Sequence, residues 1–89
     1  MSELILETNT ENFELKYFRY AHQFEGDGDD KAVVYGITAQ KQRNGVVLEE
    51  SDSGPVSLKS NEVDNLIHIL GRNTVTPMLL CEILDEILN

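Results

Sequence analysis

The sequence is poor in positive charge, in cysteine and in long apolar runs. Seven Lys and Arg residues stand against sixteen Asp and Glu residues, which gives a formal net charge of −9 at pH 7. A surface with this charge is repelled by phosphate backbones and anionic membranes, so neither direct nucleic-acid binding nor membrane binding is expected. The imbalance grows along the chain, because eight acids and five bases precede Val46, whereas eight acids and two bases follow from Val46 onward.

The single cysteine, Cys81, excludes an internal disulfide and suits a reducing compartment. No positively charged start precedes an apolar run at the N-terminus, and no run approaches the roughly 18 apolar residues of a membrane-spanning helix. These absences predict a cytoplasmic protein. The length of 89 residues predicts a single domain spanning residues 1–89, with room for one modest core.

The first half of the chain has the two-residue period of β-strands. Apolar residues follow an alternating pattern in the segments 3–9, 13–24 and 32–41. In 13–24 the pattern changes phase after Tyr17, which indicates either a bulge or a long twisted strand with both faces partly covered. The segment EGDGDDK at 25–31 interrupts the pattern with two glycines among acids, which is typical of a hairpin loop. These features predict consecutive antiparallel strands.

The Asn-Gly pair at 44–45 is a strong hairpin signal, because both residues tolerate positive φ. A two-residue loop there would place Val46 and Leu48 on the same sheet face as Ile37 and Ala39. The segment SDSGP at 51–55 is predicted to interrupt the strand. A short fifth strand at the edge of the sheet, at 56–60, is then an open alternative.

From Ser60 onward the period becomes helical. Ser60 or Asn61 would cap the first helix, and Gly71 would end it as a left-handed residue after the last turn. The residues expected on its buried face are Val63, Leu66, Ile67 and Leu70.

The second helix is predicted to begin with Thr76 as N-cap and Pro77 at its first position. Its apolar residues spread over an arc of about 180°, wider than the roughly 100° that an amphipathic helix needs. One explanation is that the helix is wedged between the sheet and the first helix, which would use both edges of the arc. The other is that part of the arc forms a homodimer or partner interface, and the two are compatible because small domains often complete their core by association. The candidate interface residues are Leu80, Leu84 and Leu88.

Strands followed by helices, rather than alternating with them, predict an α+β fold. We expect an antiparallel meander of four to five strands packed against two C-terminal helices. One face of such a sheet is apolar and the other mostly polar.

The segments VVYGITAQK (33–41) and NLIHILGRNTVTPMLLCEILDEIL (65–88) resemble a small family of unknown function from Firmicutes. The resemblance implies a bacterial cytosolic protein, but it implies no particular activity. The matching positions are Tyr35, Gly36, Ile37, Leu66, Ile67, Leu70, Asn73, Val75, Thr76 and Pro77.

No catalytic, cofactor or metal motif emerges from the sequence. An EF-hand loop counted from Asp27 would need glycine and glutamate where Ala32 and Thr38 stand. Neither histidine has Cys or His partners at the spacing of a metal site. Cys81 is expected to be a half-buried structural cysteine, because neighbouring carboxylates would raise rather than lower the pKa of its thiol.

The leading functional hypothesis is therefore a small regulatory module that binds another protein, or a second copy of itself, without catalysis. The alternative is an acidic inhibitor that mimics nucleic acid and occupies the groove of a nucleic-acid-binding protein. Strand alternation would send Glu49 and Glu50 to opposite faces, which weakens the case for one acidic stripe. The candidate mimic residues are Asp27, Asp29, Asp30, Glu49, Glu50 and Asp52.

Overall fold

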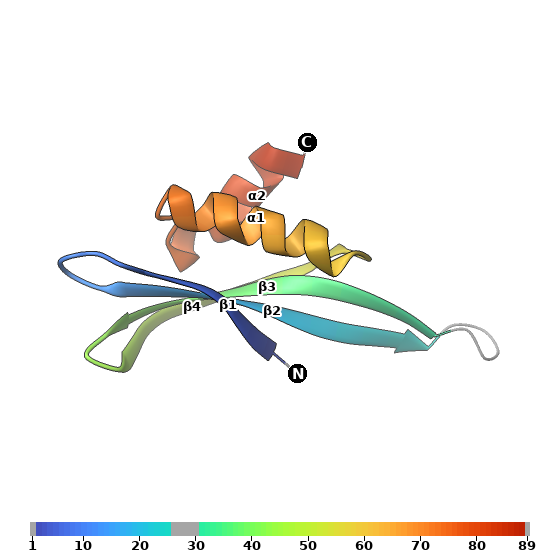
Figure 1. The fold of residues 1–89 in the computed structure, drawn as a ribbon, viewed down its shortest axis with the longest axis horizontal. Coiled ribbons are helices and arrows are strands. Elements are labelled where there is room, and N and C mark those ends of the chain that lie inside the picture. Colours follow the sequence, from blue (N-terminus) through green and yellow to red (C-terminus); the bar gives the residue numbers. More distant parts are fainter. Residues whose placement is uncertain (1, 26–30, 89) are drawn as a thin grey trace.

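The computed structural model describes residues 2–25 and 31–88, which form one sheet covered on one face by helices (Figure 1). The strands β1 (Ser2–Asn9), β2 (Glu14–Glu25), β3 (Lys31–Arg43) and β4 (Val46–Ser57) are antiparallel in the order β1-β2-β3-β4. Helix α1 (Ser60–Arg72), the 3₁₀ turn η1 (Pro77–Leu79) and helix α2 (Leu80–Leu88) follow. The predicted α+β fold is confirmed.

The core lies between the helices and the inner face of the sheet. Residues of β2 and β3 alternate, so that every second side chain points toward the helices. The four residues predicted for the buried face of α1 are all buried, as the helical period indicated. The core consists of Leu15, Tyr17, Ile37, Ala39, Val63, Leu66, Ile67, Leu70, Val75, Leu80 and Leu84.

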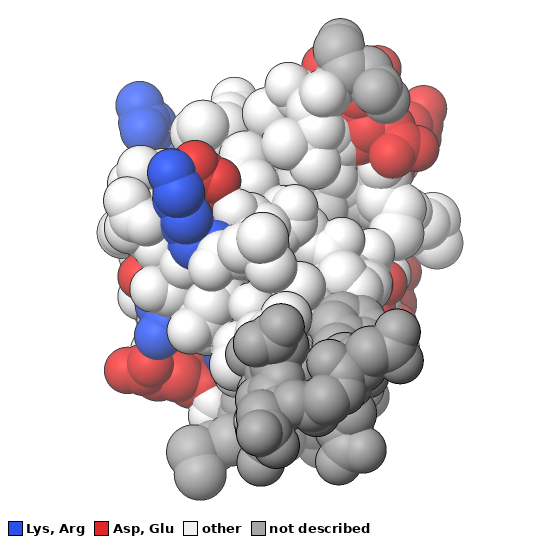
Figure 2. Space-filling view, turned by 90° about the vertical axis from the view of Figure 1, so that its right-hand side faces the viewer, with Lys and Arg blue, Asp and Glu red and all other residues white. Residues whose placement is uncertain are grey.

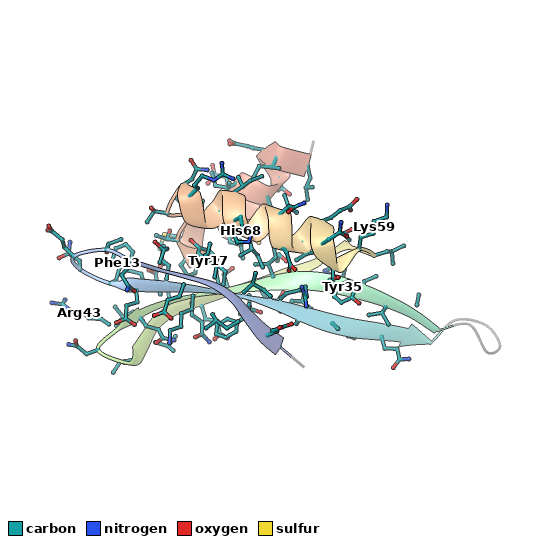
Figure 3. All side chains as sticks on the ribbon, in the orientation of Figure 1. Phe13, Tyr17, Tyr35, Arg43, Lys59 and His68 are labelled. Atoms are coloured by element: carbon teal, nitrogen blue, oxygen red, sulfur yellow. The ribbon has the colours of Figure 1, made fainter. Side chains whose placement is uncertain are left out.

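Tyr17 connects the centre of the sheet to the turn between the helices (Figure 3). Its side chain is fully buried, and its hydroxyl donates a hydrogen bond to the Val75 carbonyl oxygen at 2.7 Å. The Leu70 carbonyl oxygen lies 3.5 Å from the same hydroxyl. Burial raises the pKa of Tyr17 to about 12, with the Val75 hydrogen bond acting in the opposite direction.

Arg19 is the charged counterpart of Tyr17 on the inner face of the sheet. Its Nη1 donates to Asp64 Oδ2 of α1 at 2.6 Å, and its Nη2 donates to Glu3 Oε2 of β1 at 2.8 Å. The guanidinium also lies 5.8 Å from the centre of the Tyr35 ring. One side chain thus joins β1, β2 and α1, and its bonds to both carboxylates satisfy a largely buried charge.

The two ends of α1 differ from the prediction. The N-cap is Lys59 and no side chain caps the helix, so the prediction that Ser60 or Asn61 would cap it is wrong. Gly71 lies inside the helix, and the positive φ occurs at Thr74 instead. The reason is packing: a Cβ on Gly71 would overlap the Leu6 side chain, so glycine lets α1 approach β1 closely.

The Asn-Gly turn at 44–45 forms as predicted, with positive φ at both residues. Val46 pairs with Arg43 and so lies on the same sheet face as Ile37 and Ala39, as the turn predicts. For Leu48 the predicted placement is wrong, because the register shifts between Lys41 and Gln42 and brings Glu49 rather than Leu48 opposite Lys41. Neither residue joins the core, since Val46 is 61% exposed and Leu48 is 52% exposed.

The segment 51–55 continues β4 rather than breaking the chain, so the predicted break is wrong. Gly54 takes a φ of +75°, and the pairing with β3 shifts twice between Tyr35 and Thr38. These bulges absorb the turn-forming residues within one long strand. Within residues 2–25 and 31–88 the sheet therefore has four strands and not five.

Gly36 on β3 is required by a contact on the outer face of the sheet. The Tyr20 ring lies across it, and a Cβ there would overlap that ring and lie 2.6 Å from the Gly54 carbonyl oxygen. The Tyr20 hydroxyl donates to Asp52 Oδ1 at 2.7 Å, and the same oxygen accepts the Gly54 amide at 2.8 Å. Gly36 thus allows an aromatic side chain to connect β2 with the bulged part of β4.

Strands β2 and β3 extend beyond their neighbours as a two-stranded ribbon (Figure 1). They pair as far as Glu25 and Lys31, whereas β1 begins opposite Tyr20 and β4 ends opposite Tyr35. The loop predicted at 25–31 falls mostly on residues 26–30, which lie outside the described residues.

The change Tyr17→Phe is expected to lower the free energy of unfolding by about 1–3 kcal/mol, because the buried Val75 carbonyl loses its donor. Urea denaturation at neutral pH measures this difference. Unchanged stability would mean that the hydrogen bond contributes nothing.

The same variant should alter the response to alkaline pH. An unfolded tyrosine ionises around pKa 10.0, whereas folded Tyr17 keeps its proton to about 12. Its contribution to stability is therefore complete below pH 10 and is lost as the pH rises toward 12. The wild type should lose more stability between pH 9 and 12 than Tyr17→Phe does, as denaturation across that range would show; equal losses would contradict the burial.

Gly36→Ala is expected to destabilise the fold by about 1–3 kcal/mol, because the added methyl displaces the Tyr20 ring. Thermal unfolding compared with Thr38→Ala, on the same face of the same strand, measures the effect. The reasoning fails if the two variants are equally stable.

Candidate protein-interaction groove

Helix α2 buries the middle of its apolar arc and leaves both margins accessible. Leu80 is fully buried and Leu84 is 4% exposed, because α2 packs across β4 and completes the core. Both therefore belong to the core and do not line an accessible surface, which corrects the predicted interface. Leu88, at 55% exposure, is the one of the three predicted residues that another protein could contact.

The other margin of the arc begins at Leu79, which is 44% exposed, and continues to the half-buried Ile83. The arc of about 180° is therefore used only in part, and a surplus remains on each side. The predicted wedge between the sheet and the first helix, which would use both edges of the arc, is not found, because α2 packs on β4 and η1 and both edges stay accessible. Only the Leu88 margin faces α1, where it helps to form a groove.

This groove, here called the C-terminal groove, has a volume of about 260 Å³. Val56 at the end of β4, Leu66 and Ile69 of α1, and Leu88 of α2 supply its apolar lining. Figure 2 shows this end of the molecule, where much of the surface is uncharged and acidic side chains gather at its upper right corner.

Carboxylates lie at the margins of the C-terminal groove. Glu62 of α1 accepts a hydrogen bond from the Ser57 hydroxyl at 2.6 Å, and its other oxygen is 4.0 Å from Lys59 Nζ. Figure 3 shows Lys59 at the N-terminal end of α1, pointing away from the sheet. On α2, Asp85 is exposed three residues before Leu88, on an adjacent part of the helix surface.

The sequence missed Ile69, Val56 and Glu62 as groove residues. Ile69 stands beside the predicted buried face of α1, at a position that helical periodicity alone leaves at the boundary. Val56 follows the predicted chain break at 51–55, which separates it from β4 in the sequence-based interpretation, whereas in the structure it is part of β4. Val56 and Ile69 share one signal, which is an apolar side chain next to residues that complete the core.

The candidate acidic surface is only partly described, since Asp27, Asp29 and Asp30 lie outside the described residues. Glu49 forms an ion pair with Lys41 at 3.1 Å on the inner face of the sheet. Glu50 accepts a hydrogen bond from Gln40 Nε2 at 2.6 Å, on the opposite face.

Asp52 lies on the outer face with Glu50 and accepts the hydrogen bond from Tyr20. The three described acids therefore divide between two faces, as strand alternation indicated, and each is bonded within the chain. They do not form one continuous stripe.

The remaining reactive side chains do not converge. Cys81 is exposed, which corrects the half-buried position predicted for it, and its Sγ lies 3.8 Å from the Asp52 carbonyl oxygen. His22 and His68 are both exposed. Among the residues that the structure describes, no three His, Cys, Asp or Glu side chains are grouped as a metal site would require.

None of the helices described, α1 and α2 included, has the length and apolar character needed to cross a membrane.

Comparison with known proteins places the whole chain in one family. No curated protein and no solved structure matches it. A family model described as a family of unknown function (DUF6514) matches residues 2–89. The resemblance to an uncharacterised family, first noted in the segments 33–41 and 65–88, is thus confirmed and extends through β1 and β2. The chain belongs to this family of unknown function, DUF6514.

Proposed function

We propose that the protein is a small cytoplasmic binding module without catalytic activity, which holds a segment of another protein in the C-terminal groove. The observation that carries this proposal is Leu88. It is a large apolar side chain, more than half exposed, beside the apolar surfaces of Leu66, Ile69 and Val56.

The groove has the composition of an interface centre. Charged residues are depleted and aliphatic ones are gathered where three elements of structure meet. One partner side chain of the size of leucine or phenylalanine, fully buried there, would contribute about 1.5–3 kcal/mol. The groove is small, so the contact surface must extend beyond it to reach the roughly 800 Å² per partner of a stable complex.

The described acids give less support to the nucleic-acid mimic. A mimic needs carboxylates arrayed along one face, whereas Glu49 and Glu50 point to opposite sides of the sheet. The apolar groove therefore carries the proposal, and the acidic surface does not.

Binding should depend on the Leu88 margin of α2 and not on the opposite margin. A partner captured by the wild type is expected to bind at least about 10-fold more weakly to Leu88→Asp or Ile69→Asp, because a charge would be buried in the apolar contact. Leu79→Asp is the matched control, with the same change at the other margin. Calorimetry on the purified partner measures all four proteins, and equal losses for Leu79→Asp and Leu88→Asp would reject the groove.

Substitutions of Leu84 and Leu88 should distinguish a residue that stabilises the fold from one that serves binding. Leu84→Ala is expected to cost about 2–5 kcal/mol, as for other fully buried leucines. Leu88→Ala should cost less than about 1 kcal/mol, because the side chain is already half in water. Urea denaturation compares the two, and a large loss for Leu88→Ala would assign that residue to the core.

A further inference from the structure

We infer that the segment bound in the C-terminal groove carries Lys or Arg beside its apolar anchor, and that the occupant is another protein rather than a second copy of this chain. This inference rests on the proposed function and adds the chemistry of the partner. It follows from where the charges lie around the groove.

Glu62 supplies a negative charge on the α1 side. Its carboxylate lies in the groove lining, oriented by the hydrogen bond from Ser57. Its contact with Lys59 is long, at 4.0 Å, and both side chains are more than half exposed, so the pair contributes little. A cation on a partner could replace Lys59 at small cost.

Asp85 supplies a second charge on the α2 side. It lies one helical turn from Leu88, which places it about 60° around the helix on the same side. Its side chain makes no ion pair within the described residues. Glu82 and Glu86 add charge to α2, which contains no basic residue.

The basic residues near the centre of the sheet do not neutralise these acids. Arg19 is bonded to Glu3 and Asp64, and Lys41 is bonded to Glu49. Arg72 lies at the other end of α1, ten residues and nearly three turns from Glu62. An apolar anchor with flanking cations therefore matches the groove in charge as well as in hydrophobicity.

The same charges oppose a second copy as occupant. Two copies would each bring a net charge of −9, and a twofold contact would place identical surfaces together. Glu62 and Asp85 of both chains would then gather around one apolar centre. At physiological ionic strength the screening length is about 8 Å, so these carboxylates would repel one another across the contact.

The test is a selection from a random 12-residue peptide display library on the intact wild-type protein, at about 50 mM salt. The enriched peptides should carry an apolar residue flanked by Lys or Arg, and should bind at least about 10-fold more weakly to Leu88→Asp. The double variant Glu62→Gln/Asp85→Asn should bind these peptides about 3–10-fold more weakly, which is the effect expected for the loss of two exposed charges. Raising the salt to about 1 M, where the screening length is about 3 Å, should produce a similar loss in the wild type.

The matched control is Glu7→Gln/Glu11→Gln, which removes the same net charge from two exposed positions away from the groove. If this control weakens binding as much as Glu62→Gln/Asp85→Asn does, the attraction is only that of the net charge and the inference fails. Enriched peptides without basic residues that still depend on Leu88 overturn the inference and leave the proposed function standing.

Two further outcomes are decisive. If no enriched peptide depends on Leu88, the proposed function fails and the inference fails with it. Sedimentation of the wild type at micromolar to millimolar concentration should show a monomer. A dimer that Leu88→Asp dissociates and Leu79→Asp does not would assign the groove to a second copy and overturn the inference.

Discussion

The hydrogen bond from Tyr17 to the Val75 carbonyl is the contact on which the arrangement of the helices depends. The ring fills the centre of the core, and the hydroxyl reaches the chain just after α1 ends. A buried carbonyl without a donor is costly, so the turn between the helices stays over the sheet. That position determines where η1 and α2 begin, and hence which side of α2 meets β4.

The charged side chains around this contact are of two kinds, those bonded within the chain and those left exposed. Arg19 is satisfied by Asp64 and Glu3 and contributes to the joining of sheet and helix. The carboxylates of α2 have no such partners within the helix and remain exposed. The surplus acid of the chain is therefore available to an external cation at α2, whereas the charges on the inner face of the sheet are used internally.

The C-terminal groove is a consequence of how a short helix covers a sheet. A helix of nine residues with an apolar arc of about 180° can bury only the central part of that arc against β4. Leu80 and Leu84 occupy that part, and Leu88 continues past the end of the sheet contact toward α1. Leu88 is the most exposed of the large apolar residues of α2, and it is the one on which the proposed contact with a partner depends.

The sequence by itself determined the order of elements, the buried face of α1 and the positions of the Asn-Gly turn and of Pro77, because these depend on local periodicity and on backbone preferences of single residues. Only the tertiary structure decided the register of β4, the exposure of Val46 and Leu48, and the role of Gly71. A bulge changes the face of every later residue without leaving a periodic signal, and a close helix–strand approach is a contact between distant segments. For the same reason the sequence could identify the surplus on α2, but only packing against β4 and α1 selected Leu88 over Leu80 and Leu84.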